Sequence, residues 1–284
     1  MAAARQIRAG AGAVVVIVLI IAALALTNAM HVRFPTAGSG SCLVHGGNFD
    51  VPLDPGQAGI AATIAGVATH RSMPVRAVTI AYAAALQESH LQNLPYGDRD
   101  SVGVFQQRPS AGWGSRRQLL NPVYATTRFF AALAAVPQYL RLPVDRAAQA
   151  VQHSADGRAY SQYARQGATM AGGVSGRQPH AVWCWYSTPI HGRSRLIAAK
   201  TELRETFGRL AIRHVGDPHA EVRVRTVAAG WAVAAWLVSH AGRFKLQRVT
   251  YQGYQWTAAH GRKGWIAMPR PARQAAAHQG VAFG

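Results

Sequence analysis

Acidic side chains are scarce in this chain. Only 11 Asp and Glu stand against 30 Lys and Arg in its 284 residues, and the formal net charge is +19 at pH 7. Lysine is nearly absent as well, so arginine carries almost all of the positive charge. A field of this sign suits nucleic acid, anionic lipid or an anionic polymer of the cell wall, because it is long-ranged and does not select among them. The charge therefore excludes only partners that do not tolerate a cationic protein.

Cysteine is the second shortage. Cys42 and Cys184 are the only two, and neither lies in a CxxC motif or a lipobox, so metal binding and lipidation fit them poorly. His214, Asp217 and His219 lie close together in the sequence without a metal-peptidase motif, and we interpret the two histidines as surface residues. We therefore predict no metal and no cofactor.

One long apolar run lies at the N-terminus. The segment 9–26, "AGAGAVVVIVLIIAALAL", is uncharged, and at about 1.5 Å per residue it spans roughly the 30 Å hydrocarbon core once its flanks are included. Arg5 and Arg8 precede it, which predicts a cytoplasmic N-terminus and an exported body in a single-pass protein of the cell membrane. We therefore expect a membrane anchor within 1–30. A cleaved signal peptide with its site at 27–29 is the alternative.

Export changes the interpretation of the two cysteines. In an oxidising compartment, a disulfide between Cys42 and Cys184 is the simplest pairing. Two unpaired thiols stay open as the alternative, because the sequence does not show whether the two residues lie close together.

Composition divides the rest of the chain into five segments. Two stretches rich in Gly, Pro and Ser indicate linkers, helical periodicity lies between them, strand-like alternation follows them, and the end of the chain lacks periodicity. The predicted order is a linker over 31–55, a mostly α domain over 56–166, a linker over 167–195, a small α+β module over 196–267 and a disordered tail over 268–284.

Local patterns predict the main elements inside these segments. The signals are apolar residues at helical spacing, proline in the first turn of a helix, glycine after a helix, and alternation beside a hairpin turn. The predicted elements are helices from Gly56, Pro74 and Pro122, helices over 144–152 and 226–241, and strands over 221–224 and 247–251.

Glu88 ends an apolar, alanine-rich run in "YAAALQESHLQ". On the helix that begins at Pro74, this glutamate shares a face with Val78, Ala81 and Ala85, so it emerges from an apolar wall at the helix C-terminus. Loss of water and the negative end of the helix dipole both disfavour a charged carboxylate. A protonated carboxyl is what glycosidic cleavage requires. A solvated glutamate at a helix end is the alternative that this stretch alone leaves open.

The segment after Glu88 carries a second motif. "ALQESHLQNLPYGDRDSVGVFQQRPSAGWG" resembles the signature of the lysozyme-like lytic transglycosylases, the superfamily of soluble transglycosylases and goose-type lysozymes. In that family a helix ends Glu-Ser, and a loop then reads Ser-x-Gly, two apolar residues and Gln, with Pro shortly after. The resemblance spans about 56–163 and looks like a variant typical of exported actinobacterial chains. The matching residues are Glu88, Ser89, Ser101, Gly103, Val104, Phe105, Gln106 and Pro109.

This resemblance implies a fold and an activity. The fold would be a mostly α lysozyme-like domain of an α+β superfamily, placed after the transmembrane helix and before the small α+β module. The protein would be a membrane-anchored lytic transglycosylase, or a muramidase-type hydrolase, that cuts the MurNAc–GlcNAc bond of peptidoglycan with Glu88 as its single acid/base. The residues expected to bind substrate are Ser89, Ser101, Gly103, Phe105, Gln106 and Gln152.

One part of the family pattern is altered. The third motif usually reads Ala-Tyr-Asn-Ala-Gly, and its counterpart here is "AVQHSADG", where Val151 replaces the tyrosine and Gln152 stands near the asparagine. We therefore expect the tyrosine that orients the acid or the substrate to be missing. This favours the alternative of a catalytically weak, lysozyme-like protein that binds peptidoglycan or acts as a scaffold. Asp98 and Asp100 allow an inverting hydrolase, although we interpret them as stabilising the loop with Arg99 or Arg108.

A third function class is a binder of anionic polymers or DNA at the cell surface. The excess of arginine supports it, but the charge is scattered and no nucleic-acid motif is present. We therefore predict peptidoglycan strands, the membrane and anionic wall polymers as partners, and no specific nucleic acid.

Overall fold

The structure is a computed structural model that describes residues 40–47, 49–153, 157–216, 219–269 and 280–284. The expected membrane anchor within 1–30 lies outside these residues, and so does most of the expected tail. Within the described ranges, no helix combines the length and the hydropathy needed to cross a membrane.

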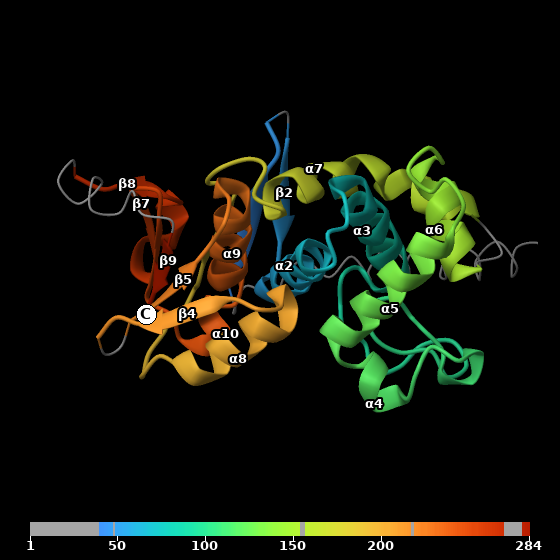
Figure 1. The fold of residues 1–284 in the computed structure, drawn as a ribbon, viewed down its shortest axis with the longest axis horizontal. Coiled ribbons are helices and arrows are strands. Elements are labelled where there is room, and N and C mark those ends of the chain that lie inside the picture. Colours follow the sequence, from blue (N-terminus) through green and yellow to red (C-terminus); the bar gives the residue numbers. More distant parts are fainter. Residues whose placement is uncertain (1–39, 48, 154–156, 217–218, 270–279) are drawn as a thin grey trace, which may run out of the picture. The chain divides into compact units, whose positions relative to one another are not determined.

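A three-stranded antiparallel sheet joins two distant parts of the chain (Figure 1). Its order is β2 (Asp50–Leu53), β1 (Ser41–His45) and β3 (Val182–Trp185), all of them in segments expected to be linkers. Along β1, buried Cys42 and Val44 alternate with partly exposed neighbours, which is the period of a strand with one covered face.

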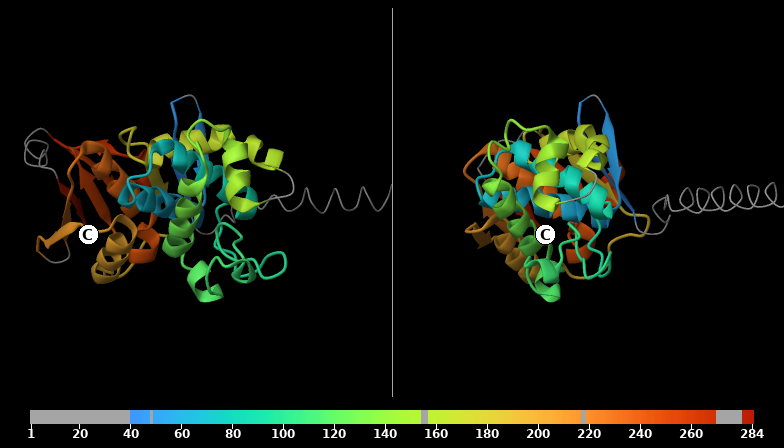
Figure 2. Two further views of the ribbon diagram at one scale, coloured as in Figure 1. Left: turned by 45° about the vertical axis from the view of Figure 1, so that its right-hand side comes forward. Right: turned by 90° about the vertical axis from the view of Figure 1, so that its right-hand side faces the viewer.

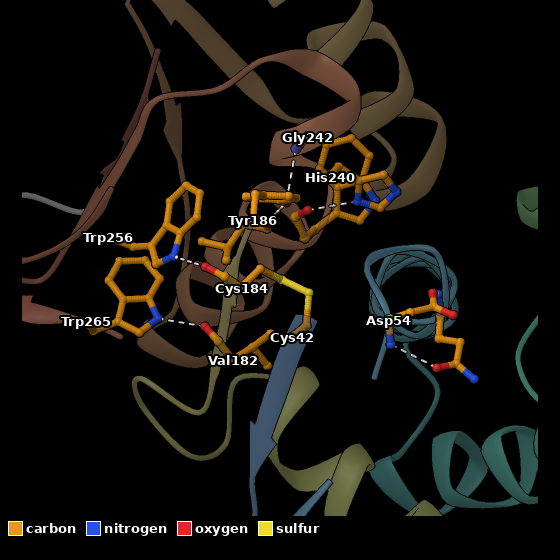
Figure 3. Close-up of a disulfide and its surroundings, with 12 residues drawn as sticks. Cys42, Asp54, Val182, Cys184, Tyr186, His240, Gly242, Trp256 and Trp265 are labelled. Atoms are coloured by element: carbon orange, nitrogen blue, oxygen red, sulfur yellow. Dashed lines mark hydrogen bonds between the residues drawn. A yellow bond between two sulfur atoms is a disulfide. The ribbon is translucent and has the colours of Figure 1, made fainter. Parts of the chain in front are cut away.

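The two cysteines lie directly opposite each other in this sheet. Cys42 pairs with Cys184 in the register of β1 and β3, and the two form a disulfide bond that Figure 3 shows. Both side chains are fully buried. The bond therefore joins two strands whose cysteines are 142 residues apart in sequence.

Two alanine-rich helices form the centre of the core. In α2 (Pro55–His70), Asp54 caps the first turn by accepting from Gln57 N, and the Gln57 side chain accepts from Asp54 N in return. The small side chains of α3 (Val75–Ser89) let α7 (Ala164–Val174) approach closely, and a Cβ on Gly167 of α7 would lie 3.0 Å from Thr79 O. After α3 the chain forms η1 (Pro109–Ala111), α4 (Arg116–Leu119), α5 (Pro122–Ala135), α6 (Val144–Gln152), η2 (Gly157–Tyr163) and α7 (Ala164–Val174).

A six-stranded antiparallel sheet occupies the C-terminal part, next to the apolar helix α9 (Val227–Ser239) (Figure 2). Helix α9 packs on both this sheet and α2, so the two sheets and the helices share one hydrophobic core. The sheet order is β4 (Ala211–His214), β5 (Ala220–Arg223), β9 (Gly280–Phe283), β6 (Arg248–Tyr251), β7 (Tyr254–Thr257) and β8 (Ile266–Ala267). The remaining elements are α8 (Leu196–Phe207), α10 (Ala241–Phe244) and η3 (Ala258–Lys263).

The expected fold class, a mostly α lysozyme-like domain followed by a small α+β module, is wrong. Two antiparallel sheets are present, and each takes strands from segments expected to be linker or tail. The reason is that β1, β3 and β9 are only four or five residues long, and their apolar residues follow one another in the sequence without regular polar positions between them. β3 and β9 pair only with strands far away in sequence, and β1 has β3 as a distant partner beside its neighbour β2. A local pattern does not show such pairing.

Candidate active site

Glu88 lies in the last turn of α3, at the edge of the core. The alanines on its face, Ala81, Ala84 and Ala85, are fully buried, while Glu88 itself is only partly buried. The helix then stops abruptly, because His90 and Leu91 both adopt left-handed backbone angles (φ 52° and 59°). Their amides donate to Leu86 O and Ala85 O, which satisfies the final carbonyls of the helix. The turn leads the chain directly into the loop that carries the second motif.

A tyrosine holds the carboxylate of Glu88. Tyr160 of η2 donates from its hydroxyl to Glu88 Oε1 at 2.7 Å, and its ring is buried against α3. Glu88 takes part in none of the ion pairs found among the described residues. Its carboxylate is therefore oriented by a neutral phenol and not by a cation.

Tyr160 lies outside the three motifs, and the sequence did not lead us to expect it beside Glu88. We expected the orienting tyrosine to be absent because Val151 stands at its place in the motif, and this expectation is wrong. Val151 is a buried core residue on α6, and Tyr160 reaches Glu88 from the following 3₁₀ helix. The only sequence signal is the aromatic pair in "RAYSQY", which is also typical of an ordinary core.

Ser89 ties the helix to the loop. Its side chain is buried, and its hydroxyl lies 2.7 Å from Val104 O and 3.1 Å from Ala85 O. The same oxygen accepts from Gln92 N at 3.2 Å. Ser89 therefore positions the loop next to Glu88 through internal hydrogen bonds.

Ser101 and Gln106 brace the loop from inside. The Ser101 hydroxyl donates to Asp98 O at 2.7 Å and lies 3.1 Å from the Gln106 amide. That amide also donates to Gly103 O and Tyr96 O, and Gln106 has a left-handed backbone (φ 46°). Gln106 is partly exposed, whereas Ser101 is buried.

The remaining expected binding residues also shape the loop. Gly103 has φ +82°, and a Cβ there would lie 2.4 Å from Leu119 O, so glycine permits a close contact with the end of α4. Phe105 is fully buried and stacks on Phe129 with ring centroids 4.5 Å apart. Gln152 of α6 donates to Phe105 O at 2.8 Å. Together these contacts fix the backbone of the loop at Gly103 and Phe105.

Asp100 stabilises the same loop through Ser110 and Arg108. Its carboxylate accepts from Ser110 N at 2.7 Å and from Arg108 Nε at 3.0 Å. These contacts, the Ser110 amide first and the Arg108 guanidinium next, lower the pKa of Asp100 to about 2. Asp100 is therefore ionised and stabilises the loop through Arg108 and Ser110, and the pairing with Arg108 agrees with the sequence-based prediction.

A second glutamate lies in a different environment. Glu202 of α8 accepts from Arg243 at 2.6 Å and lies 3.8 Å from His240 Nε2. Burial raises the pKa of Glu202 against the opposing effect of Arg243, and burial lowers the pKa of His240 to about 4. His240 is therefore neutral near pH 7, with its Nδ1 bonded to Trp236 O (Figure 3).

Glu202 and His240 line a cavity of about 540 Å³ between α2, α5 and α8, whereas Glu88 does not line it. The two glutamates therefore lie in different surroundings: Glu202 lines a cavity beside a cation, and Glu88 lies at the end of α3 beside a neutral hydroxyl.

Comparison with known proteins adds no assignment. No model of a known protein family matches this chain, and no curated protein is significantly similar to it. Across the part of the chain that the structure describes, no group of three or more His, Cys, Asp and Glu is arranged to hold a metal ion.

Proposed function

We propose that this protein cleaves the glycan strands of peptidoglycan between MurNAc and GlcNAc, as a lytic transglycosylase with Glu88 as its acid/base. The observation that carries the proposal is the 2.7 Å hydrogen bond from Tyr160 to Glu88, which forms no ion pair with any residue that the structure describes. The motif from Glu88 to Pro109, which resembles that of the lytic transglycosylases, supplies the substrate class.

The chemistry uses one carboxyl twice. Glu88 first gives its proton to the glycosidic oxygen, and the bond from that oxygen to the muramyl C1 breaks. The Glu88 carboxylate then removes the proton from the muramyl 6-hydroxyl, whose oxygen bonds to C1 and closes a 1,6-anhydro ring. Glu88 ends the cycle protonated, as it began, and no water is consumed.

Tyr160 fits both halves of this cycle. Its hydroxyl donates to Oε1, so it stabilises the carboxylate that forms after the first proton transfer. It also fixes the carboxyl plane, which leaves Oε2 as the oxygen that exchanges the proton. A phenol makes this hydrogen bond without placing a permanent positive charge beside the carboxyl group.

Two alternatives are less well supported. A hydrolase of the inverting type needs a second carboxylate as base. Asp100 is occupied by Ser110 and Arg108, and Asp98 is an exposed side chain 3.9 Å from Arg99. The alternative of a peptidoglycan binder without turnover was favoured by the expected absence of a tyrosine that orients the acid. Because Tyr160 donates a hydrogen bond to Glu88, that reason no longer applies. The disulfide between Cys42 and Cys184 supports an exported body, since such bonds persist in oxidising compartments.

The test is mass spectrometry of peptidoglycan digests made with the full chain in a non-ionic detergent. We expect 1,6-anhydromuropeptides from the wild type and none from Glu88→Gln, while Glu205→Gln, an exposed control, behaves as the wild type. Products ending in reducing muramic acid would indicate hydrolysis. Insoluble complexes without any soluble product would favour the binding alternative.

A further inference from the structure

A second cavity, of about 790 Å³, lies where α2 and α8 end and α9 begins, beside β4 and β5. Three arginines line it: Arg209 after α8, Arg223 at the end of β5, and Arg225 just beyond. We call it the arginine cavity. None of its lining residues is acidic.

The three arginines have no counter-charge within the described part of the chain. None of them forms an ion pair or a side-chain hydrogen bond with any residue that the structure describes. The nearest acid along β5, Glu221, already accepts from Arg213 at 2.7 Å. The two acids of α8, Glu202 and Glu205, line the other cavity. Like charges around one concavity raise its positive potential, and a bound anion relieves their repulsion.

The adjoining helix adds to this potential. Helix α9 has 13 residues, and its N-cap Thr226 accepts from Ala229 N. Ala229 in the first turn lines the arginine cavity, so the positive end of the helix dipole lies at the same place. Arginine is the side chain whose planar fork best matches the oxygens of a phosphate. The charged half of the cavity therefore suits a phosphate group.

The floor of the arginine cavity is apolar. Phe207, Val224 and Val233 form it and are almost fully buried, while Leu210 and Ala229 are partly exposed at its edge. A free phosphate or a sugar-phosphate polymer gains nothing from such a floor. An attached hydrocarbon chain gains about 25 cal/mol for each Å² of apolar surface that leaves water.

We propose that the arginine cavity binds a phosphate ester carried on an apolar chain, which is the chemistry of an anionic lipid. The arginines and the start of α9 hold the phosphate, and the floor takes the first carbons of the chain. This site is separate from Glu88 and does not depend on glycan cleavage. An anionic polymer of the wall shares the phosphate but lacks the apolar chain, so the same experiment distinguishes the two.

The experiment measures binding by the full chain in a non-ionic detergent, from the rise in its thermal unfolding midpoint. The probes are dihexanoyl phosphatidic acid, dihexanoyl phosphatidylcholine, glycerol 3-phosphate and poly(glycerol phosphate). Phosphatidic acid should raise the midpoint most. Phosphatidylcholine has the same acyl chains and glycerol 3-phosphate the same phosphate, so both should have much smaller effects.

Two variants and one control test whether phosphatidic acid binds at the arginine cavity. Replacing Arg209, Arg223 and Arg225 together with Gln should weaken phosphatidic acid binding by about tenfold or more, because each charge-assisted contact is lost. The control replaces Arg117, Arg141 and Arg146, which are exposed arginines outside the cavity, and should bind as the wild type. Leu210→Gln should weaken phosphatidic acid binding and leave glycerol 3-phosphate unaffected.

Three outcomes would overturn the proposal. Equal weakening by both triple variants would mean that net charge is responsible and not the cavity. Equal binding of poly(glycerol phosphate) and phosphatidic acid would mean that the apolar floor is not used and that the ligand is a polymer. The absence of any midpoint shift would mean that the cavity holds no such ligand.

Discussion

Glu88 and Glu202 are both partly buried, but they have opposite neighbours. Glu88 is held by the neutral hydroxyl of Tyr160 at 2.7 Å. Glu202 is held by the cation of Arg243 at 2.6 Å, with neutral His240 at 3.8 Å. A glutamate paired with an arginine leaves an unmatched cation when it takes up a proton, whereas a glutamate paired with a phenol does not. The proposed function therefore assigns proton transfer to Glu88, and the predictions below test the two glutamates against each other.

Reduction of the disulfide should cause the largest loss of stability. We expect this loss in the part of the fold that contains Glu202. The disulfide fixes β3, where Cys184 O accepts from Trp256 Nε1, and it lies close to Tyr186 just after β3, whose hydroxyl accepts from Gly242 N beside Arg243. Because reduction frees two residues 142 apart in sequence, we expect it to lower the unfolding free energy by about 2–5 kcal/mol. Urea titration with and without reductant measures this. At urea concentrations below the unfolding midpoint, reduction should leave the rate of glycan cleavage unchanged. Loss of cleavage by reduced protein that is still folded would contradict the separation of the Glu88 region from the Glu202 region.

His240 should make stability depend on pH. Its folded pKa of about 4 lies below the ordinary 6.5, so both states are neutral above pH 6.5 and the stability is complete there. As the pH falls from 6.5 to 4, His240 takes up a proton in the unfolded chain but not in the folded state. The free energy of unfolding therefore falls by at most about 3 kcal/mol.

Glu202 acts in the opposite direction, because its folded pKa is raised and its contribution to stability is complete only below its unfolded pKa. The measurement is therefore a comparison of urea midpoints from pH 7 to 4 for the wild type and His240→Asn. The urea midpoint of His240→Asn should fall much less between pH 7 and pH 4 than that of the wild type. Parallel declines would show that His240 is not the group responsible.

Tyr160→Phe should slow cleavage by about 10–100-fold, since it removes one hydrogen bond to a charged group and keeps the buried ring. The effect should fall on kcat and leave KM nearly unchanged, because Tyr160 contacts the acid and not the sugar. Tyr163→Phe, in the same 3₁₀ helix, should stay close to the wild type. A rise in KM alone would assign Tyr160 to substrate binding.

Arg243→Gln should have the smallest effect. Because the Arg243 side chain is 59% exposed, water screens its ion pair with Glu202, and we expect a loss of only about 0.5–1 kcal/mol. Arg204→Gln on α8 is the control, since Arg204 is exposed and belongs to none of the ion pairs among the described residues. Glycan cleavage should be unchanged in both variants.

The elements that could be predicted from the sequence are those fixed by local signals. Pro74 and Pro122 mark the starts of α3 and α5, the segment 144–152 forms α6, and the strands beside the hairpin at 252–253 are β6 and β7. Each depends on capping, periodicity or turn residues within a short window. The placement of Glu88 on the apolar face of its helix has the same origin.

The parts that could not be predicted depend on contacts between distant residues. β1 and β3 pair although their cysteines are 142 residues apart in sequence, and β9 inserts between β5 and β6 from a segment without periodicity. Tyr160 reaches Glu88 through the packing of η2 on α3, which no motif spacing specified. The roles of Ser89 and Ser101 also depend on burial, since a serine that binds sugar and one that bonds a carbonyl look alike in sequence.

The most direct test of the account is the rate of glycan cleavage by Glu88→Gln and Glu202→Gln, measured side by side on the same peptidoglycan. The substitution keeps the shape of each side chain and removes its ability to transfer a proton. We expect a loss of about 10²–10⁴-fold for Glu88→Gln and a rate within about twofold of the wild type for Glu202→Gln, which removes only a screened ion pair. Equal losses in the two variants, or full activity in Glu88→Gln, would contradict the assignment of Glu88 as the acid/base.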